Sequence, residues 1–410
     1  MSKKLDLIVF GATGFTGRLV AEYLNRRYGA DSGVRWAMAG RSLSKLDEVR
    51  DLIQVPSSVP LIAADATDAA ALRRLVASTR AVITTVGPYQ LHGEALLQAC
   101  VDTGCDYLDL CGEPAWMAKM IRRHHAGAQA SGARIVFSCG FDSVPFDLGV
   151  RFLQHHAIAR DGQPLRHVQG RVMVMKGGFS GGTAASLVET MAAMGRDPEA
   201  ASAMANPFAL TPGFNGPPQP DVKEAQLDEF TGTWSAPFVM AAINTKNVHR
   251  SNALLGHLYG QDFVYNERMS CGSGNGGELR ARGMVRTETL QNTLLGFGPT
   301  RALIRRFVLP KPGTGPGPRA RESGRYDLLF SGVGARGQRL TARVTGDRDP
   351  GYGSTSKIIS ECALALVQDI SRQATPGGVW TPGAALGMAV VPRLQERAGL
   401  SFTLETGASY

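Results

Sequence analysis

The first third of the chain alternates short apolar runs rich in β-branched residues with amphipathic segments of helical period. This alternation is typical of βαβ units, in which helices join parallel strands. The pattern predicts strands at 5–10, 34–39, 59–64, 81–86, 107–110 and 134–138. Between them it predicts helices near 16–28, 43–53, 68–78, 92–103 and 115–130. We therefore expect an α/β Rossmann domain, a doubly wound parallel sheet, over residues 1–145.

A different rhythm begins after Pro145, with longer elements and a Pro- and Gly-rich stretch at 206–220. The pattern predicts a helix through about residue 156, a helix near 183–195, and strands near 166–175, 261–270, 325–333 and 338–346. Alternation of this kind favours a mixed or antiparallel sheet, so we expect a second, α+β domain over residues 146–350. The last segment, 351–410, has helices predicted at 355–372 and 385–397 and is expected to pack back on the Rossmann domain.

The composition is that of a globular protein with more than one domain. The 410 residues exceed the about 100–200 of a typical domain. Hydrophobic residues make up 43% and charged residues 19%, which argues against disorder and coiled coil. The apolar runs fall short of the about 18 residues that span a bilayer, and the first one leads into a glycine motif without a signal-peptide cleavage site. We expect a cytoplasmic protein.

The cysteines give no sign of a metal site. They include no CxxC pair and no spacing typical of structural zinc, and they stand at Cys100, Cys105, Cys111, Cys139, Cys271 and Cys362. We expect six reduced thiols and no bound metal.

Most of the net charge of +9 is concentrated in one stretch. Between Arg301 and Arg343 there are ten Lys or Arg residues and two acidic residues, a local charge of +8. Such a stretch can meet an acidic protein or an anionic membrane face, or be a solvated basic surface. Nucleic acid is the weakest partner, because the stretch contains no recognition-helix or RNA-binding signature and is broken by KPGTGPGP.

The strongest motif is GATGFTG, in which Gly11, Gly14 and Gly17 stand between the first predicted strand and the first predicted helix. In dinucleotide-binding folds such glycines allow a tight turn, a close approach of the pyrophosphate, and close packing of helix on strand. The phosphates then lie at the helix N-terminus. Further donors at this turn are Thr13, Phe15 and Thr16.

The ends of the following strands predict how the rest of the dinucleotide binds. The second strand ends in AGRS, so Arg41 and Ser42 stand where a site for NAD usually has an acidic residue. A guanidinium and a hydroxyl there favour the 2′-phosphate of NADP(H).

The remaining two strand ends have weaker signals. After the third strand, Asp65 and Ala66 would lie beside the adenine, although Asp65 is equally well explained as a helix cap. After the fourth strand, Gly87 and Pro88 would flank the nicotinamide.

The catalytic chemistry is less clear from the residues. None of the nine tyrosines has a lysine four residues later, which argues against the YxxxK chemistry of short-chain dehydrogenases. The turn after the sixth strand reads CGFDSVPFDLG and lies at the carboxyl edge of the sheet, where ligands bind in such folds. There Asp142 and Ser143 either face the substrate or form the N-cap of the next helix.

Several segments together resemble a known family. GATGFTGRLVAEYL, AGRS, TTVGPY, YLDLCGE, SCGFDSVPFDLG and GGVWTPGAALG are similar to segments of the saccharopine dehydrogenase-like oxidoreductases. Within that family the chain most resembles the mycobacterial trans-acting enoyl reductases, and NTKNVHRSNALL and VLPKPGTGP extend this resemblance into the second half.

The resemblance implies an NADPH-dependent reduction of a C=C bond in a polyketide-derived acyl chain, within cell-envelope lipid biosynthesis. The partner would be a polyketide synthase without a working enoyl reductase, and its acidic acyl carrier domain would meet the basic stretch. Peripheral contact with the inner membrane face is a further expectation. Tyr89, just after the nicotinamide turn, would donate a proton or contact the oxyanion, or would only pack on the ring.

Two alternative functions remain. The first is a saccharopine dehydrogenase-like oxidoreductase that acts on another C=C, C=O or C=N substrate. The second is a non-catalytic NADP(H)-sensing protein. Oxidation of NADPH that depends on an α,β-unsaturated acyl-carrier substrate distinguishes an enoyl reductase from both alternatives.

Overall fold

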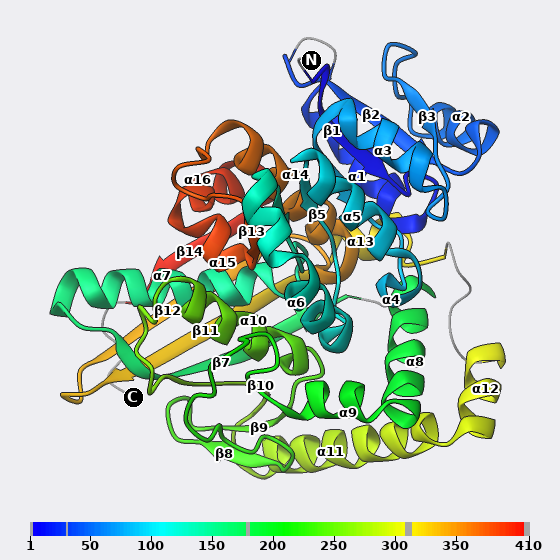
Figure 1. Cartoon of the computed structure of the whole chain (residues 1–410). Helices are drawn as coiled ribbons and strands as arrows, with labels where there is room; N and C mark the ends of the chain where they lie inside the picture. Colours follow the sequence, from blue (N-terminus) through cyan, green and yellow to red (C-terminus); the bar gives the residue numbers. More distant parts are fainter. Residues whose placement is uncertain (1–2, 30–31, 178–180, 308–313, 406–410) are drawn as a thin grey trace.

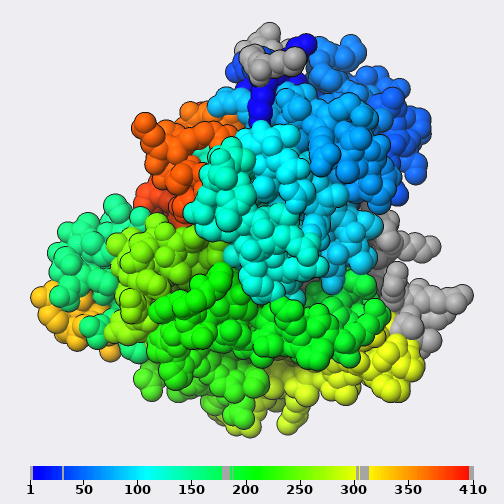
Figure 2. Space-filling view, in the orientation of Figure 1, coloured from blue at the N-terminus to red at the C-terminus, as the bar shows by residue number. Residues whose placement is uncertain are grey.

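The computed structural model describes residues 3–29, 32–177, 181–307 and 314–405. Within these residues the strands form two sheets of seven, which we call sheet A and sheet B. Sheet A contains the blue to teal strands of Figure 1 together with β13 from the last segment, and sheet B the green to red strands. The space-filling view shows the cyan surface of the first half lying directly on the green surface of the second (Figure 2).

Sheet A is parallel throughout and has the order β13-β6-β5-β4-β1-β2-β3. Its strands are β1 (Leu5–Phe10), β2 (Trp36–Gly40), β3 (Leu61–Ala63), β4 (Thr79–Thr84), β5 (Asp106–Leu108), β6 (Arg134–Val136) and β13 (Gly378–Trp380). Its connecting helices are α1 (Phe15–Arg27), α2 (Leu43–Leu52), α3 (Ala69–Ala77), α4 (Tyr89–His92), α5 (Glu94–Thr103) and α6 (Pro114–Ser131). The strand order reverses between β1 and β4, which confirms the predicted doubly wound sheet.

Sheet B is mixed, as the second-half pattern predicted. Its order is β14-β12-β11-β7-β10-β9-β8, and only the pair β7–β10 is parallel within the described residues. Its strands are β7 (Leu165–Lys176), β8 (Gln226–Asp228), β9 (Thr233–Pro237), β10 (Val264–Gly272), β11 (Arg325–Gly334), β12 (Arg339–Gly346) and β14 (Leu400–Leu404). The helices around it are α7 (Val144–Asp161), α8 (Gly181–Arg196), α9 (Pro198–Ala205), α10 (Ala241–Leu254), α11 (Gly274–Gly296), α12 (Gly298–Phe307) and α13 (Pro318–Glu322).

The last segment of the chain contributes to both sheets. It contains η1 (Pro350–Ser354), α14 (Thr355–Gln368), α15 (Pro382–Ala385), η2 (Gly387–Val390), α16 (Val391–Arg393) and η3 (Leu394–Ala398). Strand β13 extends sheet A, whereas β14 extends sheet B. The helix predicted over 385–397 corresponds to η2, α16 and η3, which follow one another over 387–398 as 3-10, α and π turns. Gly387, with a φ of +52°, separates this run from α15. The predicted domain boundaries at 145 and 350 stay a prediction.

Two large hydrophobic clusters lie on the two faces of sheet A, and one of them continues into sheet B. Alternate residues of β1 point to opposite faces of sheet A, so Leu7 and Val9 lie in one cluster and Ile8 and Phe10 in another. The first cluster continues through α14 into sheet B, where it includes Phe330. No helix in the described part of the chain is long and apolar enough to cross a membrane.

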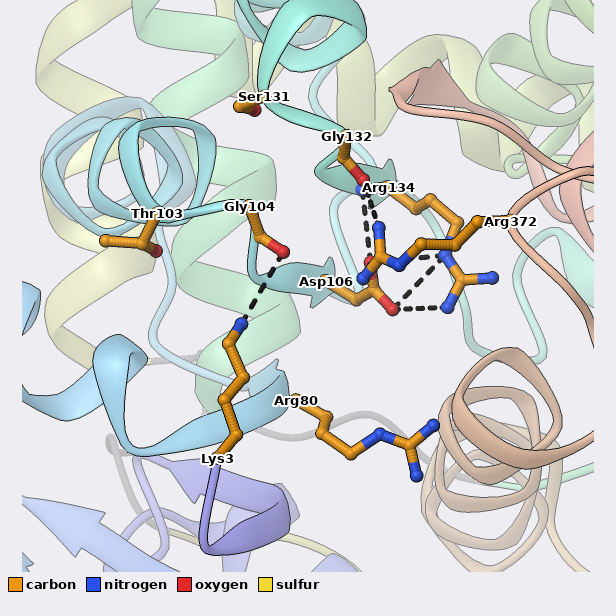
Figure 3. A pocket seen from close by; sticks show the side chains of 9 residues that line it. All are labelled: Lys3, Arg80, Thr103, Gly104, Asp106, Ser131, Gly132, Arg134 and Arg372. Carbon is orange, nitrogen blue, oxygen red and sulfur yellow. Dashed lines mark hydrogen bonds and ion pairs between the residues drawn. The ribbon is translucent and has the colours of Figure 1, made fainter. Parts of the chain in front are cut away.

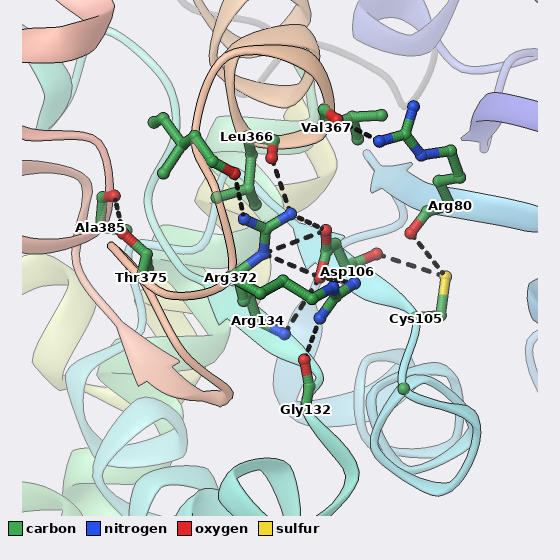
Figure 4. A network of polar contacts seen from close by, with 12 residues as sticks. Arg80, Cys105, Asp106, Gly132, Arg134, Leu366, Val367, Arg372, Thr375 and Ala385 are labelled. Carbon is green, nitrogen blue, oxygen red and sulfur yellow. Dashed lines mark hydrogen bonds and ion pairs between the residues drawn. The ribbon is translucent and has the colours of Figure 1, made fainter.

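A buried ion pair ties the end of α14 to the amino edge of sheet A. The guanidinium of Arg134 donates to Asp106 at the start of β5, with Nε 3.1 Å from Oδ1 (Figure 4). Its remaining nitrogens donate to the carbonyls of Leu366 and Ile370, at 2.7 and 2.9 Å. Arg134 therefore satisfies carbonyl groups that the end of a helix leaves without an intrahelical partner.

A cavity of about 680 Å³ opens at the same amino edge (Figure 3). The cations that line it already have protein partners: Arg372 donates to Asp106, Arg80 pairs with Asp6, and Lys3 donates to the Gly104 carbonyl. The cavity also lies at the opposite edge of sheet A from the glycine motif. We therefore assign these cations a structural role and do not interpret the cavity as a ligand site.

We expect Arg134→Met to lower the free energy of unfolding by about 3–5 kcal/mol, because it leaves the buried Asp106 carboxylate without its main partner. The matched control is Arg372→Met, which removes a second partner of Asp106 whose side chain is 49% exposed. That variant should cost about 1 kcal/mol or less. Urea denaturation measures both, and equal losses would contradict the assignment.

Candidate functional site

The glycine motif forms a tight turn at the carboxyl end of β1. Gly11 has a φ of +89°, which favours glycine. A Cβ on Gly17 would lie 2.2 Å from the Gly11 carbonyl oxygen, so only glycine lets α1 approach this closely. Gly14 occupies the N-cap position, where no side chain caps the helix and no acidic residue stands in the first turn. The first backbone N–H groups of α1 are therefore not capped by a side chain, and together with the positive helix end they fit a dinucleotide pyrophosphate.

Three further predicted donors surround this turn. Thr13 is exposed, and Phe15 and Thr16, the first two residues of α1, are half-buried. The Phe15 ring lies 5.2 Å from the ring of Tyr352, which belongs to η1 in the last segment. The second half of the chain therefore reaches the predicted phosphate site.

The carboxyl ends of β2 and β3 bring Arg41 and Asp65 near each other. Arg41 follows β2 directly and is exposed. Ser42 is the N-cap of α2 and accepts a hydrogen bond from Lys45 N at 3.3 Å. The Asp65 carboxylate accepts from the N–H and hydroxyl of Thr67, and these bonds, with a smaller effect of Arg41, lower its pKa.

Asp65 is therefore a turn-forming residue, while the helix cap of α3 is Asp68. Ala66, which follows Asp65, is half-buried. Arg41 makes no ion pair shorter than 4 Å with any described residue, so its guanidinium has the capacity to bind a 2′-phosphate.

The turn after β4 carries Gly87, Pro88 and Tyr89. Gly87 is exposed at the edge of the sheet, Pro88 is half-buried and Tyr89 is buried. The Tyr89 hydroxyl donates to the Thr84 carbonyl at 3.2 Å and accepts from Leu110 N at 3.1 Å. Burial raises its pKa well above the ordinary value. These contacts favour the packing role for Tyr89, and its role as proton donor stays a prediction.

The turn after β6 separates the roles of Asp142 and Ser143. Ser143 stands at the N-cap position of α7, but its hydroxyl donates to Asn244 and accepts from Asn247 instead of capping the helix. Asp142 is half-buried, and burial raises the pKa of its carboxyl to about 6. Among the described residues it makes no hydrogen bond or ion pair. Ser143 is therefore the N-cap residue by position, but neither side chain caps the helix, which leaves the Asp142 carboxyl available.

The sequence interpretation missed Glu113, which lies just after β5 in the YLDLCGE segment. Its buried carboxylate accepts from the backbone N–H groups of Tyr89 and Gln90, both at 2.9 Å. It also accepts from the hydroxyl of Ser186 in α8, at 3.2 Å. Burial raises its pKa. An acidic residue just before a proline at the carboxyl end of a strand was the available signal.

A small apolar cavity of about 20 Å³ adjoins Glu113. It lies between α6 and the helices α8 and α9, and its lining includes Trp116, Met194 and Met204. It has room for about one water molecule. Methionine side chains adapt readily to irregular apolar shapes, so this cavity offers an adaptable apolar lining beside Glu113.

Comparisons with known proteins identify the domain that carries the glycine motif and the family of the whole chain. Residues 7–136 match the model of the saccharopine dehydrogenase NADP-binding domain. A trans-acting enoyl reductase of Mycobacterium tuberculosis is 37% identical over 416 residues, and one of Mycobacterium ulcerans is 36% identical over 409, each match covering 96% of both chains. A second M. tuberculosis protein, given the same name provisionally, is 40% identical over 414 residues and 97% of both chains.

The fold also has a solved counterpart. Apo saccharopine dehydrogenase (L-Glu forming) from Saccharomyces cerevisiae superimposes with a TM-score of 0.51, over 98% of this chain and 100% of that chain. The two sequences are 12% identical, so this likeness shows the fold alone.

We expect Arg41→Met to raise the Kd for NADPH about 10- to 100-fold, because a charge-assisted contact with the 2′-phosphate is lost. The Kd for NADH, which lacks that phosphate, should stay unchanged. The matched control is Arg50→Met, which removes a cation of α2 that is already paired with Asp47. Fluorescence titration measures all the constants, and equal weakening of both nucleotides would exclude the proposed contact.

Proposed function

This chain belongs to the family of trans-acting enoyl reductases, and on that premise we propose that it reduces a C=C bond of an acyl chain attached to a carrier domain. The observation that carries the proposal is the extent of the similarity. It covers 96–97% of both chains, and therefore includes the second half that meets the substrate side of the dinucleotide site. A match restricted to the NADP-binding domain would carry no such information.

NADP(H) is the cofactor of this domain family and supplies, when bound, the hydride for the β-carbon of the acyl chain. The α-carbon then takes a proton, so that one hydride, which carries two electrons, and one proton together convert CH=CH to CH₂–CH₂ while NADPH becomes NADP⁺. The tasks of the protein are to hold the dinucleotide, to orient the thioester carbonyl, and to deliver the proton. Phosphate binding at α1 and at Arg41 performs the first task.

Asp142 is our candidate for the proton donor. It stands at the carboxyl edge of sheet A, its carboxyl has no protein partner among the described residues, and its pKa near 6 keeps part of it protonated near neutral pH. The carboxylate of Glu113, in contrast, already accepts hydrogen bonds from two backbone N–H groups and from the Ser186 hydroxyl. We therefore assign Glu113 a positioning role, in which it fixes the nicotinamide turn against α8.

We expect Asp142→Asn to lower kcat at least about 100-fold, because general acids contribute factors of this order or more. In the unaltered protein kcat should fall as the pH rises through about 6, where the acid loses its proton. In the variant this dependence should disappear. Stopped-flow measurement of NADPH oxidation between pH 5 and 8 gives both results.

Stability provides the control for Asp142→Asn. Because burial raises the pKa of Asp142 above its unfolded value, the ionised carboxylate opposes folding above pH 6, and this cost is absent at low pH. The neutral amide should therefore not destabilise the protein at pH 8. A kcat within twofold of the original, with the same pH profile, would remove Asp142 from the mechanism.

For the acyl carrier we propose an acidic domain that meets the exposed cations near α13. Arg319 and Arg325 are exposed and form no ion pair with a described residue, whereas Arg343 is neutralised by Asp327 and Glu405. The basic stretch is thus not one continuous surface, and its residues 308–313 lie outside the described part of the chain. Complementary charge would mainly raise the rate of association.

The test of the proposed function is NADPH oxidation with an α,β-unsaturated acyl group on a carrier domain. We expect oxidation that depends on the substrate and is selective for NADPH over NADH. The saturated acyl carrier is the matched control and should give none. Reduction of ketone or imine substrates, with no reaction of the enoyl substrate, would instead support another saccharopine dehydrogenase-like activity. Binding of NADPH without any turnover would support a sensing role.

The same assay tests the carrier. Charge reversal in Arg319→Glu/Arg325→Glu should raise KM about tenfold for the carrier-linked substrate and leave KM for the same acyl group on pantetheine unchanged. An unchanged KM for both substrates would exclude this docking surface.

We place the reaction in the cytoplasm, with peripheral contact at the inner membrane face. All six cysteines are unpaired and buried, which fits a reducing compartment. Exposed apolar side chains follow one side of α11 and its end, where Leu279, Leu290 and Phe297 are 74%, 59% and 63% exposed. Such a surface favours an apolar contact. Sedimentation with anionic vesicles tests it, and a protein that stays in solution would contradict it.

A further inference from the structure

Two arginines from different parts of the chain flank the first residue of the dinucleotide helix. The guanidinium carbon of Arg18, one turn into α1, lies 5.8 Å from the centre of the Phe15 ring. That of Arg321, in α13 of the second half, lies at the same distance. Gly315 packs so closely on this ring that an added Cβ would lie 2.4 Å from Phe15 Cε1. The segment 314–322 therefore lies directly against the start of α1.

Arg321 is held in this position by its own backbone and side chain. Its Nη1 donates to the Pro316 carbonyl at 2.8 Å, and its carbonyl accepts from Asp349 N at 2.9 Å. The Asp349 carboxylate in turn accepts from the N–H groups of Tyr352 and Gly353 in η1, at 3.0 and 2.9 Å. The Tyr352 ring also contacts Phe15, with 5.2 Å between the ring centres. The guanidinium is thus fixed from the second half of the chain.

The charges around Phe15 are unbalanced. Within the described residues, no carboxylate forms an ion pair with Arg18 or Arg321, although most other arginines near acidic groups are paired. The first turn of α1 contains no acidic residue, and its N-cap residue is Gly14, which has no side chain to cap the helix. Two guanidiniums therefore lie around the ring that begins α1, near a positive helix end. The nearby carboxylate of Asp349 acts on Arg321 but accepts from the N–H groups of Tyr352 and Gly353, so positive charge is left in excess, which favours anion binding.

We propose that Arg321 contacts the pyrophosphate of the bound dinucleotide, so that the second half of the chain supplies part of the cofactor site. The side chain has donors left after its bond to Pro316, and its guanidinium lies over the ring of Phe15, the first residue of the helix at whose N-terminus a pyrophosphate binds in such folds. One member of the basic stretch thus serves the cofactor. Arg18 supports the same group from within α1. The inference rests on NADP(H) binding at α1 and is independent of the acyl substrate.

A second phosphate could meet the same arginines, because the arm of an acyl carrier also bears one. We favour the dinucleotide because Arg321 packs on Phe15, the residue that begins α1, whereas the exposed cations Arg319 and Arg325 have no such contact. Pyrophosphate and carrier phosphate share their chemistry, so the test must measure each separately.

The test is the pair of dissociation constants for NADPH and NADH in Arg321→Met, which keeps an apolar stem over Phe15. Because both nucleotides contain the pyrophosphate, both Kd values should rise about 10- to 100-fold and their ratio should stay constant. Arg41→Met should change the ratio instead. Arg321→Lys should recover part of the affinity, since it restores the charge without the guanidinium fork.

Three results decide the inference. Arg319→Met, in the same short helix, should leave both Kd values unchanged, which separates a specific contact from the general charge of the segment. Unchanged Kd values in Arg321→Met, with a raised KM for carrier-linked substrate only, would assign Arg321 to the carrier phosphate and overturn the inference. If Arg321→Met fails to fold, as circular dichroism would reveal, Arg321→Lys and Arg18→Met provide the same comparison, and unchanged affinity in both overturns it. Each titration measures binding only and so stays valid even if the enoyl reductase assay gives no turnover.

Discussion

The buried carboxylate of Glu361 fixes α14 against the dinucleotide helix, and the shape of the whole site depends on this contact. It is fully buried and accepts hydrogen bonds from the hydroxyls of Tyr23 and Tyr28, at 2.6 and 2.8 Å, near the end of α1. Arg393 supplies the balancing charge at 3.1 Å. An unpaired carboxylate in such a place would be costly, so the two helices are held in one relative position. Helix α14, from the last segment of the chain, is thereby fixed against α1, the first helix.

Because α14 is fixed against α1, the contacts at the start of α14 also fix the loops at the carboxyl edge of sheet A. At the start of α14, the hydroxyl of Thr355 accepts from Phe141 N at 2.9 Å, beside the turn that carries Asp142. Just before α14, η1 holds the segment of Arg321 against α1 through Asp349. At the other end of the site, Ser186 contacts Glu113. Residues around both sheets therefore contribute to the site, and the contrast between an engaged Glu113 and an unpartnered Asp142 is the basis on which we propose Asp142 as the proton donor.

Local patterns in the sequence predicted the Rossmann half well and the site only in part. The six strands, the glycine turn and Arg41 follow from short-range periodicity and from backbone requirements that glycine alone meets. Glu113 and Arg321 were missed as site residues because their roles depend on partners far away in the sequence, Ser186 and Phe15. Ser143 occupies the N-cap position of α7, but its side chain does not cap the helix for the same reason, since Asn244 and Asn247 of α10 engage its hydroxyl. Strand β13 was also missed: three residues carry no clear period.

The most direct measurement is a crystal structure of the protein with NADP⁺ bound. The account predicts the pyrophosphate at the N-terminus of α1, with the Arg321 guanidinium within hydrogen-bonding distance of its oxygens and Arg41 at the 2′-phosphate. It also predicts the nicotinamide beside Gly87, on the side of the site that Asp142 faces. A pyrophosphate that lies at α1 without Arg321, or a nicotinamide directed away from Asp142, would contradict the claim that both halves of the chain build one reductase site.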